Sequence, residues 1–226
     1  MMLPVSDISK KITVVTVFFA VVSLLDMVGV ILNMDELRYI FKPMLMLSLV
    51  ALYLVTTTYR NNWYIGALLF SFLGDVLLLF DGEIYFILGL LSFLIAHIIY
   101  IVIVLSWITT TSIKKIVVAS LPFLIYFLFL INFLRSSLNQ LFMPVVIYGL
   151  TISTMGLVSL LYYLNSKNTA AKYMITGACL FVISDSVLAI NKFYTSISIF
   201  PIVVMFTYLT AQYLILKAIL TYEKYN

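Results

Sequence analysis

Two aspartates lie inside long apolar segments of this sequence and are its first candidates for chemistry. Asp75 lies in the segment Leu69–Leu78, and Asp185 lies in Cys179–Leu188 in the second half of the chain. A carboxyl group in hydrocarbon surroundings is costly, so it indicates a functional site by default. Two buried carboxyl groups can divide into one acid and one base at neutral pH. We therefore interpret Asp75 and Asp185 as an acid/base pair.

Other polar side chains are predicted at related depths. Counting about 1.5 Å of rise per residue, Asp26 and Tyr148 reach the level of the two aspartates, in the outer half of a hydrocarbon core of about 30 Å. His97 is predicted some 8 Å deeper by the same count. For Asp26, a structural hydrogen-bonding role and a role at the site stay equally open. His97 taken alone fits either contact between helices or chemistry.

The composition indicates an integral membrane protein. Of 226 residues, 64% are hydrophobic and 10% are charged, with a mean hydropathy of +1.18, whereas roughly a quarter are charged in a soluble domain. The net charge of +4 does not indicate nucleic-acid binding, because the Lys and Arg residues lie between apolar runs, where they set membrane orientation. The single cysteine, Cys179, excludes an intrachain disulfide. The sequence carries no signal for an oligomeric state.

Apolar runs long enough to cross a bilayer predict an all-α bundle of eight transmembrane helices, with short connections and no room for an extramembrane domain. The first run has no small-residue cleavage site after it, so we expect a retained helix and not a signal peptide. The predicted spans are Ile12–Leu32, Phe41–Thr58, Trp63–Phe80, Ile84–Trp107, Ile116–Leu134, Leu141–Leu164, Tyr173–Ile190 and Ser198–Leu220.

The spans are predicted to form one membrane domain over residues 1–226, built from two halves of the same orientation, 1–110 and 111–226. The lead-ins to the aspartates, Gly66–Phe70 and Gly177–Phe181, are similar, as a four-plus-four repeat requires. The excess of Lys and Arg on one side predicts that both termini are cytoplasmic, in a bacterial-type cell membrane.

Several short motifs together resemble the YhhN-type lysoplasmalogenase family over essentially the whole chain. Their order along the sequence makes the resemblance more specific than any one of them. The motifs are Lys42-Pro43, Gly74-Asp75, Phe93 with His97 and Tyr100, Tyr148-Gly149, Ser184-Asp185-Ser186, Lys192-Phe193 and Gln212.

The resemblance implies a hydrolase that cleaves the vinyl ether bond of a lysophospholipid drawn from the bilayer, giving a fatty aldehyde and a glycerophospho-head group. Protonating a vinyl ether creates an oxocarbenium ion, so the reaction suits one acid and one anion, as in glycosidases. We therefore expect no cofactor, no metal and no nucleophilic serine, and we expect His97 to relay protons. Residues expected to bind the substrate are Lys42 and Lys192, at its phosphate, with Tyr148, Gln212, Asp26 and Tyr100.

Two other classes of protein stay open. Repeated halves with acids near the membrane centre also fit a small-solute or proton-coupled transporter. A metal-dependent lipid hydrolase of the ceramidase kind would need a site built from Asp26, Asp75, Asp185 and His97, and such enzymes normally use several imidazoles. Release of aldehyde distinguishes the hydrolase from the transporter, and activity that survives exhaustive chelation would exclude the metal enzyme.

Overall fold

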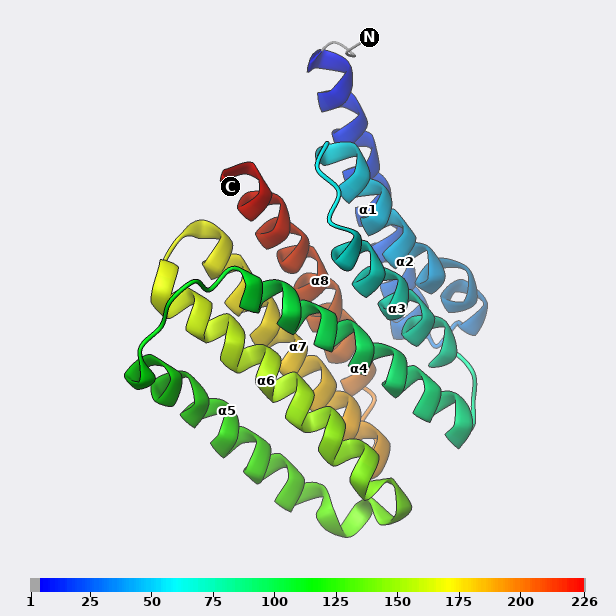
Figure 1. Cartoon of the computed structure of the whole chain (residues 1–226). Coiled ribbons are helices and arrows are strands. Elements are labelled where there is room, and N and C mark those ends of the chain that lie inside the picture. The colour runs from blue at the N-terminus through cyan, green and yellow to red at the C-terminus, as the bar shows by residue number, and fades with distance from the viewer. Residues whose placement is uncertain (1–4, 226) are drawn as a thin grey trace. The chain divides into compact units, whose positions relative to one another are not determined.

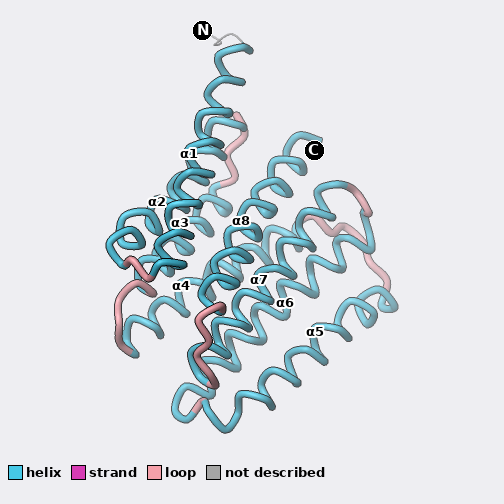
Figure 2. The backbone as a smooth tube through the Cα atoms, turned by 180° about the vertical axis from the view of Figure 1, so that it is seen from behind, coloured by secondary structure: helices cyan, strands magenta, loops and turns pink. Residues whose placement is uncertain are grey.

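The computed structural model describes residues 5–225, which form eight α-helices and two short 3-10 turns, with no strand in that range (Figures 1 and 2). The predicted all-α class is confirmed. The helices are α1 (Val5–Leu32), α2 (Asp35–Thr56), α3 (Asn62–Leu77), α4 (Glu83–Ser106), α5 (Ile113–Leu134), α6 (Phe142–Ser166), α7 (Thr169–Phe193) and α8 (Phe200–Tyr225), with η1 (Arg135–Ser137) and η2 (Asn139–Leu141) between α5 and α6.

Seven of these helices are long and apolar enough to cross a membrane, so the chain is a multi-pass membrane protein. The exception among the eight predicted spans is the third. α3 has 16 residues, which gives it a length of about 24 Å against a hydrocarbon core of about 30 Å. The orientation of the termini and the four-plus-four repeat remain predictions.

The start of α2 differs from the sequence prediction. The span was expected to begin at Phe41, but the helix begins at Asp35, inside the predicted loop. Asp35 and Glu36 occupy its first turn, where negative charge stabilises the exposed N–H groups of a helix. Lys42 consequently lies about two turns inside the helix and not at its start, and it is buried at 8% exposure.

Local sequence signals mark the ends of several helices. Asn33 follows α1 with a φ of 53°, and the Met34 N–H reaches back to the Gly29 carbonyl at 2.8 Å, which is the Schellman arrangement. The side chains of Asn61 and Asn168 cap α3 and α7 by accepting from backbone N–H groups. Such caps explain why the connections can be so short.

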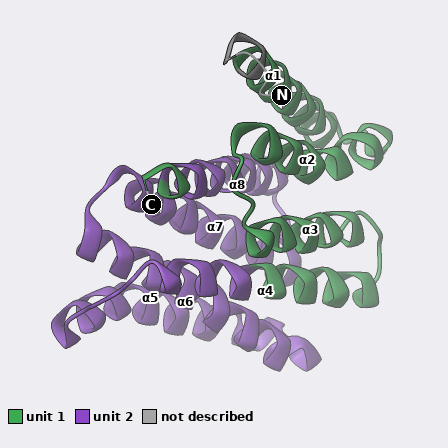
Figure 3. Cartoon of the chain, turned by 45° about the horizontal axis from the view of Figure 1, so that its top comes forward, with its two compact units in different colours: residues 1–96, 222–226 green, residues 97–221 purple. Residues whose placement is uncertain are grey.

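The described chain divides into two compact units, coloured separately in Figure 3. Unit 1 contains residues 5–96 and 222–225, and unit 2 contains residues 97–221. In unit 1, α1 packs on α2 and α2 packs on α3. In unit 2, α6 lies between α5 and α7 in both views of the ribbon. The single predicted domain and its two halves stay predictions.

A tyrosine ties the end of the chain to the α2–α3 connection within unit 1. The Tyr53 hydroxyl donates to Glu223 Oε1 at 2.8 Å and accepts from the Asn61 N–H at 2.7 Å. The Tyr53 side chain is fully buried. Its hydroxyl therefore satisfies a backbone donor of the turn and a carboxylate of the last helix together.

We expect Tyr53→Phe to lower the free energy of unfolding by about 1–3 kcal/mol, because the Asn61 N–H loses its acceptor while staying in place. Thermal unfolding of the purified protein in detergent measures the change. Tyr59→Phe, at a side chain 70% exposed, is the matched control and should leave the midpoint within about 1 °C. Equal midpoints for the two variants would contradict the role given to Tyr53.

Candidate functional site

In unit 2, a hydrogen bond joins Tyr148 of α6 to Asp185 of α7. The Tyr148 hydroxyl donates to Asp185 Oδ2 at 2.6 Å, so the prediction that these residues share one level is confirmed. Tyr148 is buried, whereas Asp185 is only partly so. Within residues 5–225, the second carboxyl oxygen, Oδ1, accepts no hydrogen bond from another side chain or backbone N–H. Asp185 therefore has one oxygen fixed by the protein and one available to a reactant.

His97 of α4 packs against the same tyrosine. Its ring centroid lies 5.7 Å from that of Tyr148 and 4.8 Å from that of Phe181, both edge-on. Phe181 precedes Asp185 by one helical turn, about 6 Å, so His97 lies deeper than Asp185, as the residue count predicted. The imidazole is fully buried, and neither nitrogen has a hydrogen-bond partner within residues 5–225. Tyr148 thus contacts His97 with its ring and Asp185 with its hydroxyl.

Tyr100 and Gln212 form a second buried polar contact in unit 2. The Tyr100 hydroxyl donates to Gln212 Oε1 at 3.0 Å, and both side chains are completely buried. Tyr100 follows His97 by about one turn of α4, on the same side of the helix. Both residues were predicted to bind substrate, and the structure shows them bound to each other.

The turn of α7 that follows Asp185 is covered by apolar side chains of the same unit. Leu134, Leu138 and Val145 form a buried cluster, against which Ala189 and Ile190 of α7 pack. These two residues lie about one turn beyond Asp185. Lys192 lies further on, in the last turn of α7, and is exposed. The exposed position fits the predicted boundary of the span.

The serines beside Asp185 are held by other groups. Ser186 donates to the Val182 carbonyl and shares a short hydrogen bond with the hydroxyl of Tyr126, from α5. Ser184 donates to the Val204 carbonyl of α8 at 3.0 Å. Both serine hydroxyls are thus engaged with main-chain carbonyls of α7 and α8. Tyr126 was not predicted as a site residue. Its only distinguishing feature in the sequence is a hydroxyl group within an apolar span.

In unit 1, Lys42 of α2 forms an ion pair with Asp75 of α3. The distance from Lys42 Nζ to Asp75 Oδ1 is 3.8 Å, and the side chains are 9% and 2% exposed. The helices run in opposite directions, which brings the start of α2 beside the end of α3. Lys42 was expected to meet a lipid phosphate at the membrane boundary. The structure instead places it inside the unit beside a catalytic candidate.

Asp26 of α1 belongs to the same end of unit 1. The side chain is fully buried, and neither carboxylate oxygen has a hydrogen-bond partner among the described residues. The charges of Lys42 and Arg38 are close enough to act on it. Asp26 therefore faces basic side chains of α2, in a position that fits both roles left open for it.

Gly74, next to Asp75, lies against an aromatic ring of α4. A Cβ added to Gly74 would lie 2.5 Å from Phe93 Cε2, closer than packed atoms can approach. Gly74 thus lets α3 and α4 pack at the level of the Lys42–Asp75 pair. This is the physical reason for the Gly-Asp motif in this chain.

We expect Gly74→Ala to destabilise the protein by about 1–3 kcal/mol, the usual cost of overpacking, and to reduce activity by displacing Asp75. The double variant Gly74→Ala/Phe93→Leu should recover most of both losses. Thermal unfolding and aldehyde release are the measurements. Gly149→Ala is the control, because its Cβ would lie 3.4 Å from the nearest atom. An inert Gly74→Ala would show that the close approach is unimportant.

The two aspartates belong to different units, each described by itself, so their action as a pair stays a prediction. Within residues 5–225, no three His, Cys, Asp or Glu side chains are placed to hold a metal ion. The ceramidase-like alternative thus finds no ligand set in the described part of the chain.

Comparison with known protein families gives a match over most of the chain. A sequence model described as the YhhN family matches residues 37–219, which cover α2 to α7 and most of α8. No curated protein and no solved structure matches the chain. The matched range includes every candidate residue except Asp26, which lies in α1.

Proposed function

Because the chain belongs to the YhhN family, we propose that it is a membrane-embedded hydrolase that cleaves the vinyl ether bond of lysoplasmalogen-type lysophospholipids. The observation that carries the proposal is Asp185, a membrane-embedded carboxyl group with Oδ2 held by Tyr148 and Oδ1 available. Family membership supports a hydrolase, and the resemblance of the site motifs supports this reaction.

The reaction is an acid-catalysed hydrolysis. A proton adds to the vinyl carbon remote from the ether oxygen, which makes an oxocarbenium ion at the carbon attached to oxygen. Water attacks this carbon and loses a proton to a base. The resulting hemiacetal collapses to a fatty aldehyde and releases the glycerophospho-head group as an alcohol. One acid and one anion therefore suffice for the chemistry.

We assign the acid to Asp185. A general acid must present its proton in a fixed direction, and the bond from Tyr148 to Oδ2 fixes the carboxyl group. The proton is then delivered from Oδ1. The expected proton relay through His97 is not retained, because neither of its nitrogens has a hydrogen-bond partner in the described part of the chain. His97 instead packs against the ring of Tyr148 and helps to hold it in place. The buried Tyr100–Gln212 hydrogen bond joins α4 to α8 in the same unit. Lys192, exposed at the end of α7, meets the phosphates of surrounding bilayer lipids at the membrane boundary.

We assign the anion to Asp75, because Lys42 holds it as one member of an ion pair. A carboxylate stabilises the positive charge of an oxocarbenium ion and accepts the proton of the attacking water. In this assignment Lys42 positions Asp75 and does not bind the phosphate.

Purified protein mixed with a lysoplasmalogen and with its saturated ether analogue tests the reaction type. We expect aldehyde from the vinyl ether and none from the saturated ether, because only a vinyl ether forms an oxocarbenium ion by protonation of carbon. Cleavage of both lipids, or of neither, would refute the proposal. In proteoliposomes, uptake of an unaltered solute without aldehyde release would favour the transporter instead.

A further inference from the structure

Arg38, in the first turns of α2, lies on the same side of that helix as Lys42 and about one turn nearer its start. It is the basic residue of unit 1 closest to the α1–α2 connection, and no role at the site has so far been given to it. Its side chain is 30% exposed, whereas Lys42 is 8% exposed and paired with Asp75. Of these two cations, Arg38 is the one that a ligand can reach.

The aliphatic part of the Arg38 side chain is fixed by its contact with α1. The Arg38 Cγ lies 2.9 Å from where a Cβ of Gly29 would be, so only a glycine leaves room for it. Arg38 Nε is buried and has no hydrogen-bond partner in the described part of the chain. The guanidinium group is therefore held in one position, while its Nε–H donates no hydrogen bond to a described residue.

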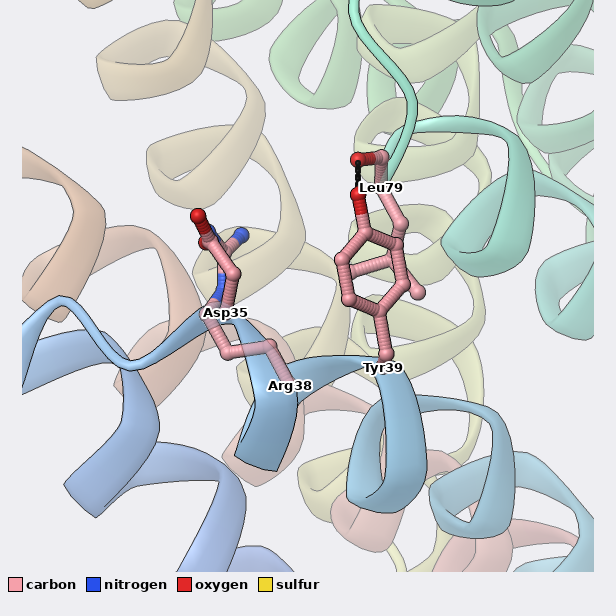
Figure 4. Close-up of polar contacts among 4 residues, drawn as sticks. All are labelled: Asp35, Arg38, Tyr39 and Leu79. Atoms are coloured by element: carbon pink, nitrogen blue, oxygen red, sulfur yellow. Dashed lines mark hydrogen bonds and ion pairs between the residues drawn. The ribbon is translucent and has the colours of Figure 1, made fainter.

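The nearby carboxylates leave Arg38 able to bind a further anion. Arg38 Nη1 donates to Asp35 Oδ1 at 3.4 Å, and the Asp35 side chain is 74% exposed (Figure 4). An exposed pair of this kind contributes little stability. The charge of Arg38 acts on Asp26, but neither Asp26 oxygen is hydrogen-bonded to a described residue. A phosphate, with several acceptor oxygens, is a better partner for a guanidinium fork than one solvated carboxylate oxygen.

Aromatic side chains beside Arg38 indicate its depth in the membrane. Tyr39 donates to the Leu79 carbonyl at 3.4 Å (Figure 4), and its ring lies 6.0 Å from that of Phe80, which lies 5.3 Å from that of Tyr85. All three rings are 44–49% exposed. Tyrosine gathers at the level of lipid head groups, which is where phosphates lie.

We propose that Arg38 anchors the phosphate of the lipid substrate and so selects lipids that carry a phosphate. The proposal rests on the proposed function and adds to it a residue that sets specificity. Arg38 binds the phosphate diester of the lysophospholipid, while the reacting vinyl ether extends toward Asp75 of the same unit, which lies beside Lys42, a residue further along α2. The phosphate of a bulk bilayer lipid could bind to Arg38 in the same way. The experiment must therefore distinguish the phosphate of the substrate from that of a bulk lipid.

The test uses the full chain purified in phosphate-free detergent. We expect Arg38→Gln to raise KM for a lysoplasmalogen roughly ten- to a hundredfold, with kcat nearly unchanged. KM for an alkenyl glycerol, which lacks the phosphate, should not change. Arg38→Lys should restore part of the loss, and Asp35→Asn should lower KM by removing the competing carboxylate. Arg135→Gln, at an exposed arginine of unit 2, is the matched control and should behave as wild type.

Each outcome has one meaning. If the wild-type protein releases no aldehyde from either lipid, the proposed function fails. If the wild type is active but Arg38→Gln keeps its KM for the phosphate-bearing lipid, or raises KM for both lipids alike, the anchor is overturned. An effect on thermal stability only in phospholipid nanodiscs, with KM in detergent unaltered, would show that Arg38 binds bulk lipid and would equally overturn the assignment.

Discussion

Asp185→Asn should reduce aldehyde release by about 10²–10⁴-fold, the usual contribution of a general acid. Asparagine keeps the shape of the side chain and can still accept from the Tyr148 hydroxyl, but it has no proton to give to carbon. Because only the chemistry is removed, the midpoint of thermal unfolding should stay close to wild type. The measurement is single-turnover aldehyde release beside a melting curve of the same sample.

Two variants separate this prediction from a structural role for the region. Tyr148→Phe removes the bond to Oδ2 and should cost roughly tenfold in kcat, since the carboxyl group is then less well positioned. Ser186→Ala should remain within a few fold of wild type, because its hydroxyl is bound to Val182 and Tyr126 and has no nucleophilic role. Full activity of Asp185→Asn, or complete inactivity of Ser186→Ala, would refute the assignment.

The helices were predictable because each apolar run is long and the turns between them carry caps. Hydropathy alone gave the wrong helix end where apolar residues continue past the last helical residue. Leu79 and Phe80 donate to carbonyls three residues back, so α3 ends at Leu77 while its sequence stays hydrophobic. At α2 the opposite happened, because charged Asp35 and Glu36 were read as loop although they stabilise a helix N-terminus.

The relative depths of the site residues were predictable only where the helix ends were predicted correctly. Counting the rise per residue placed Tyr148 at the level of Asp185 and His97 deeper, because α4, α6 and α7 begin and end near their predicted residues. The Lys42–Asp75 pair was missed, because the misplaced start of α2 put Lys42 at the membrane boundary. Tyr126 was missed for a different reason: which face of α5 packs on α6 and α7 is decided by tertiary contacts such as that between Phe123 and Gly156.

The second large effect concerns the Lys42–Asp75 ion pair. Lys42→Met and Asp75→Asn should each lower the free energy of unfolding, by up to about 3–5 kcal/mol, because each removes the nearest charge partner of a buried ion. The double variant Lys42→Met/Asp75→Asn removes both charges, so it should be more stable than the sum of the single changes predicts. Unfolding of the four proteins in detergent gives this coupling as a double-mutant cycle.

Activity in the same four proteins decides what Asp75 does. If Asp75 is the anion that stabilises the oxocarbenium ion, the double variant regains stability but stays at least about 10²-fold less active than wild type. Lys42→Met alone should retain more activity than Asp75→Asn at a temperature where both are folded, since it displaces the carboxylate without removing it. If the pair only joins α2 to α3, activity returns together with stability in the double variant, and Asp75 loses its place in the chemistry.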